Sequence, residues 1–342
     1  MRFSRKHLIY LCIVLALSIF LSTYKMPYYI YKPGNANSLD SMVVVEGGYE
    51  SEGSMHLLTV SGSYATPIHY LLAKVLPFRE VMPISAVRHE DETDEEYTNR
   101  QLYMMDDSQH ASTIVAYEAA NADIEVIHNG VYVVATVKDM PANELLKSGD
   151  VIKKVDGLTI DVSEDFMEYV EGKKEGESIT IGFERDGKEK EAEIEILPFP
   201  DEEGKIGIGI QLTTNIEVVV DPEVTFSSGR IGGPSAGLMF SLRIYDQLTE
   251  EDFTRGYKIA GTGQVDIDGN VYPIGGVDKK VVAADNEGSD VFFVPYEQGR
   301  EGSNYDEAVK TAKKIKTKMD IVPVDTFEEA LLYLENLEER IE

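Results

Sequence analysis

The chain has 342 residues, of which 43% are hydrophobic, so it has room for two or three domains with packed cores. It carries 32 basic and 61 acidic residues, a formal net charge of −29, which repels the phosphate backbone of nucleic acids. These values exclude a largely disordered chain and a nucleic-acid-binding protein. They indicate a well-solvated, acidic surface.

Cysteine and histidine usage limits the catalytic chemistry. The single cysteine, Cys12, lies in an apolar N-terminal stretch, so the rest of the chain has no thiol for a disulfide, a thiolate metal site or catalysis. All six histidines fall between His7 and His128. A nucleophile in the C-terminal two-thirds therefore needs a base other than imidazole, and we expect neither a metal nor a cofactor.

Residues 8–24, LIYLCIVLALSIFLSTY, contain no charged side chain and reach the lower limit of length for a helix that spans a bilayer. Arg2, Arg5 and Lys6 precede them, and this basic flank favours a cytoplasmic N-terminus at residues 1–7. The sequence thus predicts a single-pass cell-membrane protein whose catalytic body is extracellular. A cleaved signal peptide is the alternative, but no small-x-small cleavage site closes the segment, which favours a retained anchor.

The elements expected next are a linker, two strands and two helices. Residues 25–39 contain most of the polar, turn-rich run KPGNANSLD, which predicts a linker to the folded body. The β-rich runs 42–46 and 55–60 are separated by GGYESEGS and predict a hairpin with a long loop. Helical patterns follow over 67–76 and 95–121, and the acidic run HEDETDEEY is typical of a solvated helix start.

Residues 123–199 change to short strands, glycine turns and one helical stretch. Pro-Ala at 141–142, LLKSGDVI at 145–152 and VDG at 155–157 resemble a PDZ domain of the kind found in bacterial proteases. The resemblance implies a groove that takes an extended peptide by strand addition. A β-rich spacer without a ligand is the alternative. The resemblance also implies a loop whose backbone N–H groups hold the C-terminal carboxylate of a peptide. This loop is formed by Gly130, Val131, Tyr132 and Val133, and the glycine allows the peptide to approach the backbone closely.

A glycine-rich turn and an apolar periodic stretch, FSSGRIGGPSAGLMFSLRIYDQL, predict a helix that begins near Ser235. The unpaired N–H groups and the dipole of a helix N-terminus stabilise negative charge, which suits a developing oxyanion. Gly232 and Gly233 allow the backbone to approach a substrate, so the N–H groups of Gly233 and Ser235 are the candidate oxyanion hole. A helix cap is the alternative role for this serine.

The downstream stretch KIAGTGQVDIDGNVYPIGGVDKKVVAADNEGSDVFFVP predicts a hairpin that turns at 268–270, a helix and a buried strand. Lys279 and Lys280 open this helix beside small apolar residues. An exposed lysine, with a pKa near 10.4, cannot accept a proton at neutral pH, whereas a desolvated lysine can. Either lysine is therefore a candidate base if it is buried.

These two stretches resemble the proteolytic domain of the Lon protease family, which works through a Ser-Lys dyad. The family serine sits in GPSAG, present here at 233–237, so the resemblance makes Ser235 the nucleophile. The family lysine follows PIGG by four residues, and after 273–276 that residue is Lys280, which leaves Lys279 the less favoured base.

The resemblance assigns one supporting residue and exposes two departures. Thr262, in GTGQ, takes the place of a family threonine that hydrogen-bonds and orients the lysine. Many ATP-dependent relatives have an aspartate three residues before the serine, where this chain has Gly232. The sequence contains no G-x-x-x-x-G-K-[ST] phosphate loop, so we expect a peptidase that needs no ATP and cuts substrates that arrive already extended.

The resemblance reaches back before the PDZ-like segment, because GGYESEGSMHLLTVSG and QLYMMDDSQHASTIVAYEAAN are similar to the first strands and first helix of the Lon proteolytic domain. The expected fold is therefore α+β. A Lon-type proteolytic domain is built from residues 40–122 and 205–342, a mostly-β PDZ-like domain is inserted at 123–199, and one transmembrane helix precedes them.

The expected function is a membrane-anchored, ATP-independent serine endopeptidase that cleaves extracellular peptides or small, flexible membrane-associated proteins. Its expected partners are a peptide or unfolded-protein substrate and, through the N-terminal helix, the lipid bilayer. Nucleic acid is not expected, and an oligomer is left open. Two alternatives remain: a non-catalytic, membrane-tethered PDZ scaffold that binds peptides, and an enzyme that transfers acyl groups to small amides or esters.

Overall fold

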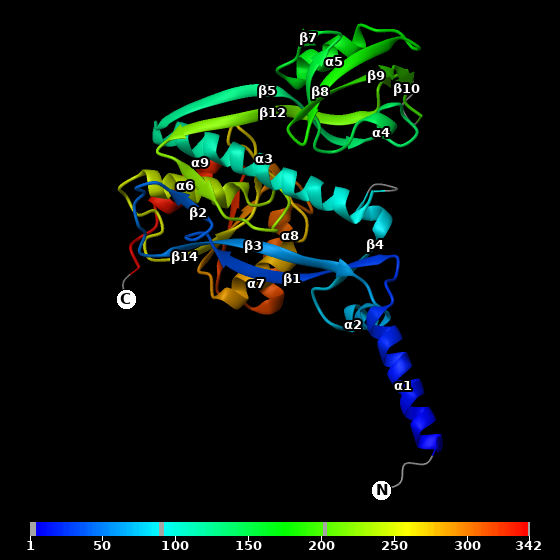
Figure 1. Ribbon diagram of the computed structural model, residues 1–342. Coiled ribbons are helices and arrows are strands. Elements are labelled where there is room, and N and C mark those ends of the chain that lie inside the picture. Colours follow the sequence, from blue (N-terminus) through cyan, green and yellow to red (C-terminus); the bar gives the residue numbers. More distant parts are fainter. Residues whose placement is uncertain (1–4, 89–91, 201–203, 341–342) are drawn as a thin grey trace.

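The computed structural model describes residues 5–88, 92–200 and 204–340. Residues 1–4 of the predicted cytoplasmic segment, with Arg2 of its basic flank, lie outside the described residues. So do residues 89–91 of the acidic run and residues 341–342 at the end of the second proteolytic segment. Figure 1 shows a body of two parts, with the segment predicted to be PDZ-like uppermost and one helix projecting from the other end.

The projecting helix is α1 (Arg5–Thr23), whose side chains face outward over its whole length. Its length and apolar composition allow it to cross a membrane, and a signal sequence would share both properties. The helix therefore agrees with the apolar segment predicted at 8–24.

The larger part is built on a six-stranded mixed sheet. From one edge to the other its order is β18 (Asp320–Val324), β17 (Val291–Pro295), β14 (Lys258–Gly261), β3 (Ser54–Tyr64), β1 (Tyr28–Ser38) and β4 (Glu80–Pro83). β3, β14, β17 and β18 are parallel, and β1 is antiparallel to both of its neighbours. The sheet therefore takes strands from both sides of the PDZ-like segment in the sequence.

The linker predicted at 25–39 is wrong, because most of it forms β1. Its turn-like residues sit at a bulge between Pro33 and Ala36, where the strand shifts register against β3. At this bulge the Asn35 N–H donates to the Thr59 Oγ1 at 3.0 Å. The residues that favour a turn in isolation thus form a bulge inside a paired strand.

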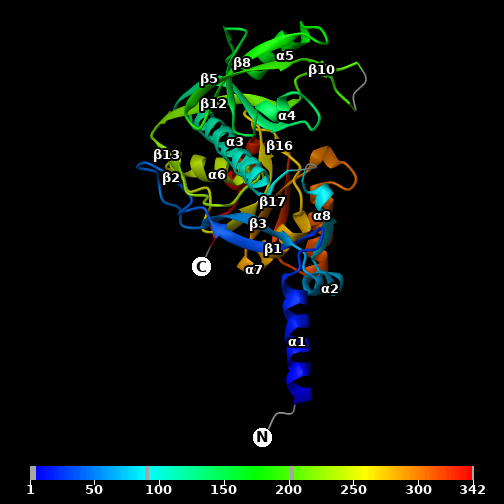
Figure 2. The same ribbon diagram turned by 45° about the vertical axis from the view of Figure 1, so that its right-hand side comes forward.

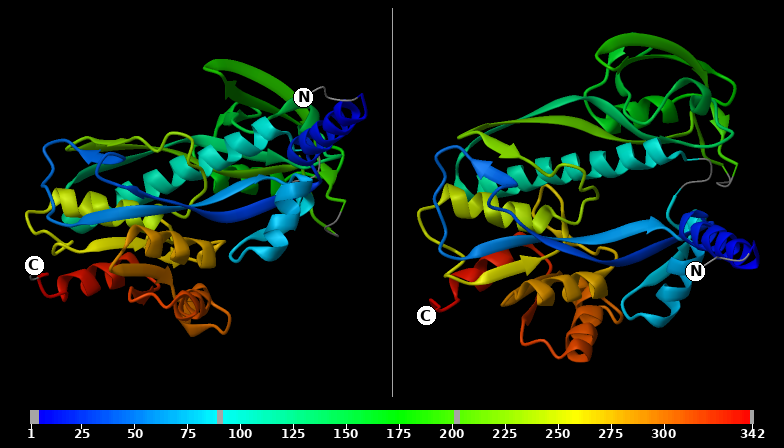
Figure 3. Two further views of the ribbon diagram at one scale, coloured as in Figure 1. Left: turned by 90° about the horizontal axis from the view of Figure 1, so that it is seen from below. Right: turned by 60° about the horizontal axis from the view of Figure 1, so that its bottom comes forward.

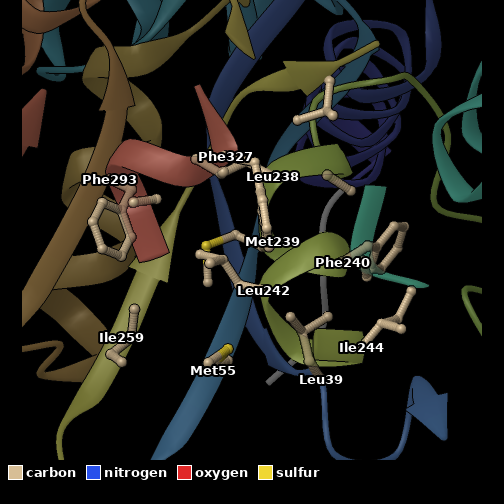
Figure 4. Packing of buried hydrophobic residues seen from close by; sticks show 14 of the residues in the cluster. Leu39, Met55, Leu238, Met239, Phe240, Leu242, Ile244, Ile259, Phe293 and Phe327 are labelled. Atoms are coloured by element: carbon tan, nitrogen blue, oxygen red, sulfur yellow. The ribbon is translucent and has the colours of Figure 1, made fainter. Parts of the chain in front are cut away.

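Helices cover both faces of this sheet. α3 (Asp94–Ala120), α6 (Gly237–Leu248) and α9 (Phe327–Glu335) lie on one face, and α7 (Val277–Glu287) and α8 (Asn304–Ile315) on the other. Adjacent strand residues alternate between the two cores: Leu57, Ile259 and Phe293 face α6, whereas Leu58, Ala260 and Phe292 face α7. Figure 4 shows Met55, Ile259 and Phe293 gathered around Leu238, Met239 and Leu242 of α6.

The long helix α3 has clear start and stop signals. A reciprocal capping box joins Thr93 and Glu96 at its start, and three acidic residues occupy its first turn. Asn121, in the left-handed conformation at φ 52°, ends it. The helix predicted at 95–121 is therefore confirmed within one residue at each end.

Shorter elements complete this part: α2 (Pro67–Val75), the 3₁₀ turns η1 (Ile84–Ala86) and η2 (Glu297–Gly299), and the hairpin of β15 (Gln264–Val265) and β16 (Val271–Tyr272). The hairpin predicted from 42–46 and 55–60 is wrong. β2 (Val43–Val45) pairs with β13 (Val224–Phe226), about 180 positions away in the sequence, and not with β3.

The PDZ-like part has its own sheet, which β12 from the following segment joins, in the order β12 (Ile210–Asp221), β5 (Asp123–Thr136), β6 (Val151–Val155), β8 (Ser178–Arg185) and β9 (Lys188–Glu195), with β7 (Leu158–Thr159) paired to β6. The short pair of β10 (Leu197–Pro198) and β11 (Ile206–Gly207) and the helices α4 (Ala142–Leu145) and α5 (Ser163–Glu171) complete it. A separate apolar cluster forms its core.

Long strands and a stacked tyrosine pair join the two parts. β5 and β12 pair antiparallel from Asp123 with Asp221 to Thr136 with Ile210, and they form an arm that runs along α3 (Figure 1). The Tyr103 ring of α3 stacks on the Tyr132 ring of β5, with 3.6 Å between ring centroids and 10° between ring planes. Burial raises the pKa of both phenols, so this contact is uncharged at neutral pH.

Candidate active site

Ser235 lies in the turn that leads into α6, two residues before the helix begins at Gly237. Its backbone is tied to the segment that follows β14: the Gly263 N–H donates to the Ser235 carbonyl at 3.2 Å, and the Thr262 hydroxyl donates to the same oxygen at 3.1 Å. The Leu238 N–H in turn donates to the Gly263 carbonyl at 3.2 Å. The serine is therefore held at a junction between a helix start and a strand end.

Lys280 reaches this junction from the first turn of α7. α7 begins after Gly276, whose left-handed φ of 72° and close contact with Val60 require a glycine. The Lys280 Nζ donates to the Ser235 Oγ at 2.6 Å and to the Thr262 Oγ1 at 2.9 Å. The structure thus brings the three residues together from α6, α7 and the end of β14.

The surroundings of Lys280 favour its neutral form. The side chain is 3% exposed, and the hydrogen bonds that hold its ammonium go to two uncharged hydroxyl groups. Burial lowers the pKa of Lys280 from its ordinary value to about 7. A substantial fraction of the side chain is therefore unprotonated at neutral pH, as a general base requires.

The neighbouring Lys279 has the same exposure and the opposite electrostatics. Its Nζ forms ion pairs with Glu80 at 2.8 Å and Asp278 at 2.9 Å. Burial lowers its pKa, but the hydrogen bonds to the two carboxylates outweigh that effect and the net shift is upward. Lys279 is a structural cation that joins α7 to β4, and its side chain points away from Ser235 toward Glu80.

The predicted oxyanion donor Gly233 is already engaged. Its N–H donates to the carbonyl of Gln101 in α3 at 2.8 Å. The loop also lies close to α3 at Gly232, where a Cβ atom would come within 2.7 Å of the Gln101 Cβ. Gly233 has a φ of 92°, a conformation that favours glycine. In this structure, an oxyanion can use the Gly233 N–H only by displacing the Gln101 carbonyl.

A cavity of about 920 Å³ opens over Ser235 and Lys280. It lies between α3 and the β1–β3 pair, which run side by side in the right-hand view of Figure 3. Its length along β1 and β3 suits an extended peptide better than a compact small molecule. Among the residues that line it are Tyr29, Tyr31, Thr59, Gln101, Met105 and Pro273.

The PDZ residues predicted to hold a carboxylate lie inside the sheet, which corrects that prediction. The Gly130 N–H donates to the backbone carbonyl of Asp161 at 3.1 Å, and the Val133 N–H to that of Asp150 at 2.8 Å. Val131 and Tyr132 are paired with β6 on one side and β12 on the other. The backbone donors of this segment are therefore used within the domain and do not form a loop that could bind a carboxylate.

A second cavity, of about 800 Å³, lies where α5 faces the segment 204–212 and the start of β12. Its walls are mostly apolar, from Phe166, Met167 and Val170 of α5 to Phe199 and Ile208. Sequence reasoning missed this groove. The run IGIGIQL at 206–212, in which glycines alternate with aliphatic residues, was the available signal for a strand start that a peptide backbone can approach.

Comparisons with known proteins match two segments of the chain. The family model of the Lon protease (S16) C-terminal proteolytic domain matches residues 215–335, and that of the PDZ domain matches residues 120–196. Lon protease of Campylobacter jejuni is 29% identical over 145 residues, which cover 39% of this chain and 17% of that protein. Lon protease of Campylobacter concisus is 34% identical over 100 residues, covering 29% and 11%. The chain thus spans less than a fifth of the length of either relative.

Solved structures match about a quarter of the chain. The PDZ domain of the SdrC-like protein from Listeria monocytogenes is 37% identical and covers 26% of this chain and 92% of its own, with a TM-score of 0.24. A solution structure from Geobacillus thermodenitrificans is 39% identical and covers 25% and 97%, with a TM-score of 0.23. By the family models, residues 215–335 are similar to a Lon protease C-terminal proteolytic domain and residues 120–196 to a PDZ domain, and an apolar N-terminal helix precedes both segments.

Proposed function

We propose that the chain is an ATP-independent, membrane-anchored serine endopeptidase in which Ser235 is the nucleophile and Lys280 the general base. The observation that carries this proposal is the 2.6 Å contact between the Ser235 Oγ and the buried Lys280 Nζ, whose pKa burial lowers to about 7. The proteolytic-domain match supports peptide bonds as the substrate class. Extended peptides and flexible, partly unfolded proteins fit the long cavity above the two residues.

In the proposed reaction, neutral Lys280 takes the hydroxyl proton as the Ser235 Oγ attacks the substrate carbonyl. The resulting ammonium gives this proton to the leaving amine as the C–N bond breaks, which leaves an acyl-enzyme and a neutral lysine. Lys280 then takes a proton from water, whose oxygen attacks the ester carbonyl, and returns this proton to the Ser235 Oγ as the bond between the acyl carbon and Oγ breaks and the carboxylic acid product leaves. Thr262 is a positioning residue, because its hydroxyl holds the Nζ in the rotamer that meets Ser235.

The tetrahedral oxyanion needs backbone donors, and Gly233 is the proposed one. Because its N–H is bonded to Gln101 in this structure, we propose that a bound substrate displaces the Gln101 carbonyl and takes the same donor. The contact keeps the N–H satisfied while the cavity is empty of peptide. It also links the chemistry to α3, the helix that contacts Tyr132 of the PDZ domain.

The proposed role of the PDZ groove is to hold an extended segment of the substrate against the start of β12. Met167 lines this groove and is 45% exposed, so an apolar peptide side chain can cover it. Met167→Glu is expected to raise the Kd for a labelled peptide with an apolar C-terminal residue about tenfold, or about 1.4 kcal/mol. Fluorescence anisotropy measures this, and Leu158→Glu, a 56% exposed position on β7, is the matched control that should bind normally.

The proposed location follows from α1. As a retained anchor with a basic cytoplasmic flank, α1 would put the proteolytic and PDZ domains on the outer side of the cell membrane. Peptides released there, and small proteins of the membrane surface, would then reach the cavity without a motor. The anchor also restricts the enzyme to substrates near the bilayer.

The test incubates the purified full chain in detergent with an unfolded protein and identifies new peptide termini by mass spectrometry. A serine-reactive fluorophosphonate should label Ser235 and abolish cleavage in proportion to labelling, whereas the heat-denatured chain should not be labelled. Cleavage that persists after complete labelling of Ser235 would refute the nucleophile. Peptide binding without any cleavage would instead support the scaffold alternative.

The pH dependence of labelling tests the base. Lys280 must be neutral to accept the Ser235 proton, so the rate should fall about tenfold for each pH unit below 7 and level off above it. Rates measured from about pH 5 to 9 would show a single rise with a midpoint close to 7. A rate that does not change across this range would contradict a lysine base with a lowered pKa.

A further inference from the structure

The short helix α2 has two apolar sides, of which only one is packed. Tyr70 and the buried Ala73 face the cluster formed by β1 and β4. On the opposite side, four aliphatic residues at positions i, i+3, i+4 and i+7 form one stripe along the helix. They are Ile68, Leu71, Leu72 and Val75, with exposures of 42%, 65%, 42% and 83%. We call these four residues the α2 stripe; all four are exposed in the described part of the chain.

The α2 stripe lies where α1 leaves the body. Figures 1 and 2 both place α2 beside the C-terminal end of α1, at the end of the body from which α1 projects, and the two helices are in contact. Backbone hydrogen bonds fix this arrangement: the Met26 N–H donates to the Ala65 carbonyl, and the Ala65 N–H donates to the Tyr28 carbonyl, both at 2.8 Å. The exit of α1 and the start of α2 are therefore one rigid unit.

A basic segment borders the stripe in this otherwise acidic chain. The Phe78 ring, just after α2, lies 4.6 Å from the Lys314 Nζ, which brings the end of α8 next to α2. Residues 310–318 read KTAKKIKTK, and all five of their lysines are exposed. Lys74 of α2 is exposed as well. The chain has a net charge of −29, so this local excess of positive charge contrasts with the rest of the surface.

We propose that the α2 stripe docks into the surface of the lipid bilayer that α1 crosses. The inference rests on the proposed membrane anchoring. Continuity with the exit of α1 places the stripe at membrane level, and the lysines of 310–318 face the phosphates of anionic lipids. If a second copy of this chain covered the stripe, the lysines of the two copies would lie close together and repel one another. The bilayer is therefore the better occupant.

This docking gives α2 a role in orienting the enzyme. A single helix such as α1 anchors the chain but leaves the body free to tilt. A second contact with the bilayer fixes the orientation of the body relative to the membrane. α2 packs on β1 and β4 through Tyr70 and Ala73, and β1 lines the catalytic cavity. The docked helix therefore also sets the orientation of the cavity. Tyr29 and Tyr31 of β1 are part of that cavity. The bilayer thus presents the cavity at a fixed height to membrane-proximal segments.

The chain contains no tryptophan, so a single introduced tryptophan reports on one site only. The full chain carrying Leu71→Trp is reconstituted into vesicles of phosphatidylcholine and phosphatidylglycerol, with or without bromine on the acyl chains. Bromine quenches an indole that reaches the headgroup and acyl boundary, where apolar faces of interfacial helices lie about 5–10 Å deep. Leu17→Trp in α1 is the control for insertion, and Leu332→Trp, 58% exposed on α9, is the control for a surface leucine away from the bilayer.

The expected result is that bromolipids remove about half or more of the emission of Leu71→Trp and of Leu17→Trp, and leave that of Leu332→Trp unchanged. Quenching of Leu17→Trp without quenching of Leu71→Trp overturns the docking proposal while the anchor stands. A blue-shifted but unquenched Leu71→Trp also overturns it, and indicates a protein partner. If neither Leu17→Trp nor Leu71→Trp is quenched, both the anchor and the docking are wrong.

Discussion

Replacing Lys280 with methionine is expected to lower kcat/KM for peptide cleavage about 10²–10⁴-fold, which is the usual contribution of a positioned general base. Methionine fills a similar volume in the buried site but cannot take the Ser235 proton. Lys279→Met should keep kcat/KM near the wild-type value, because Lys279 binds Glu80 and Asp278 rather than Ser235. Steady-state cleavage of a fluorogenic peptide at pH 8 measures both variants.

The adjacent lysines make this a matched comparison. Both are 3% exposed, both open α7, and each substitution removes one amine from the same turn. If Lys280→Met retained near-normal cleavage, Lys280 would not be the base. If Lys279→Met lost as much activity as Lys280→Met, the loss would be attributable to a disturbed α7 rather than to proton transfer.

The parts of the site that the sequence predicted are those written in short, contiguous motifs. Ser235 sits between a glycine-rich turn and an apolar helix, and Lys280 follows a turn that must start a helix, so each local geometry could be anticipated. The structure then places the two side chains in hydrogen-bond contact across 45 positions of sequence. Burial of Lys280 was visible only as a possibility, in the small residues that follow it.

Features that depend on distant partners could not be anticipated. β1 is polar and turn-like in isolation, and only its pairing with β3 and β4 makes a strand of it. β2 finds β13 rather than its sequence neighbour for the same reason. The peptide groove was misplaced to Gly130 because a glycine in an apolar run is ambiguous, whereas the register of β5 between β6 and β12 decides which donors are free.

The engagement of Gly233 was invisible for a different reason. The acceptor is the backbone carbonyl of Gln101, and the pattern of side chains in a sequence does not indicate which N–H group a given carbonyl will accept from. Close approach of α3 to the loop depends on Gly232, where a Cβ atom would come within 2.7 Å of the Gln101 Cβ. A side chain at this position would collide with α3, so the glycine is needed for packing.

Lys280→Met is also expected to make the proteolytic domain more stable at neutral pH. An unfolded lysine stays protonated to about pH 10.4, whereas burial lowers the pKa of Lys280 in the folded chain to about 7. Between these values the unfolded chain binds more protons, so the free energy of unfolding contributed by Lys280 rises with pH through this window. Below pH 7 the folded state carries the full cost of a buried ammonium, on the order of 4 kcal/mol.

Methionine removes this cost and loses the hydrogen bonds to Ser235 and Thr262, which are worth about 1–2 kcal/mol together. The variant should therefore exceed the wild type by about 2 kcal/mol near pH 7, and the advantage should vanish as pH approaches 10. Urea unfolding followed by hydrogen exchange in α6 and α7 measures the difference for the proteolytic domain alone. A difference that stays constant with pH would mean that Lys280 folds with its ordinary pKa, and an amine that is protonated at pH 7 could not serve as the base for Ser235.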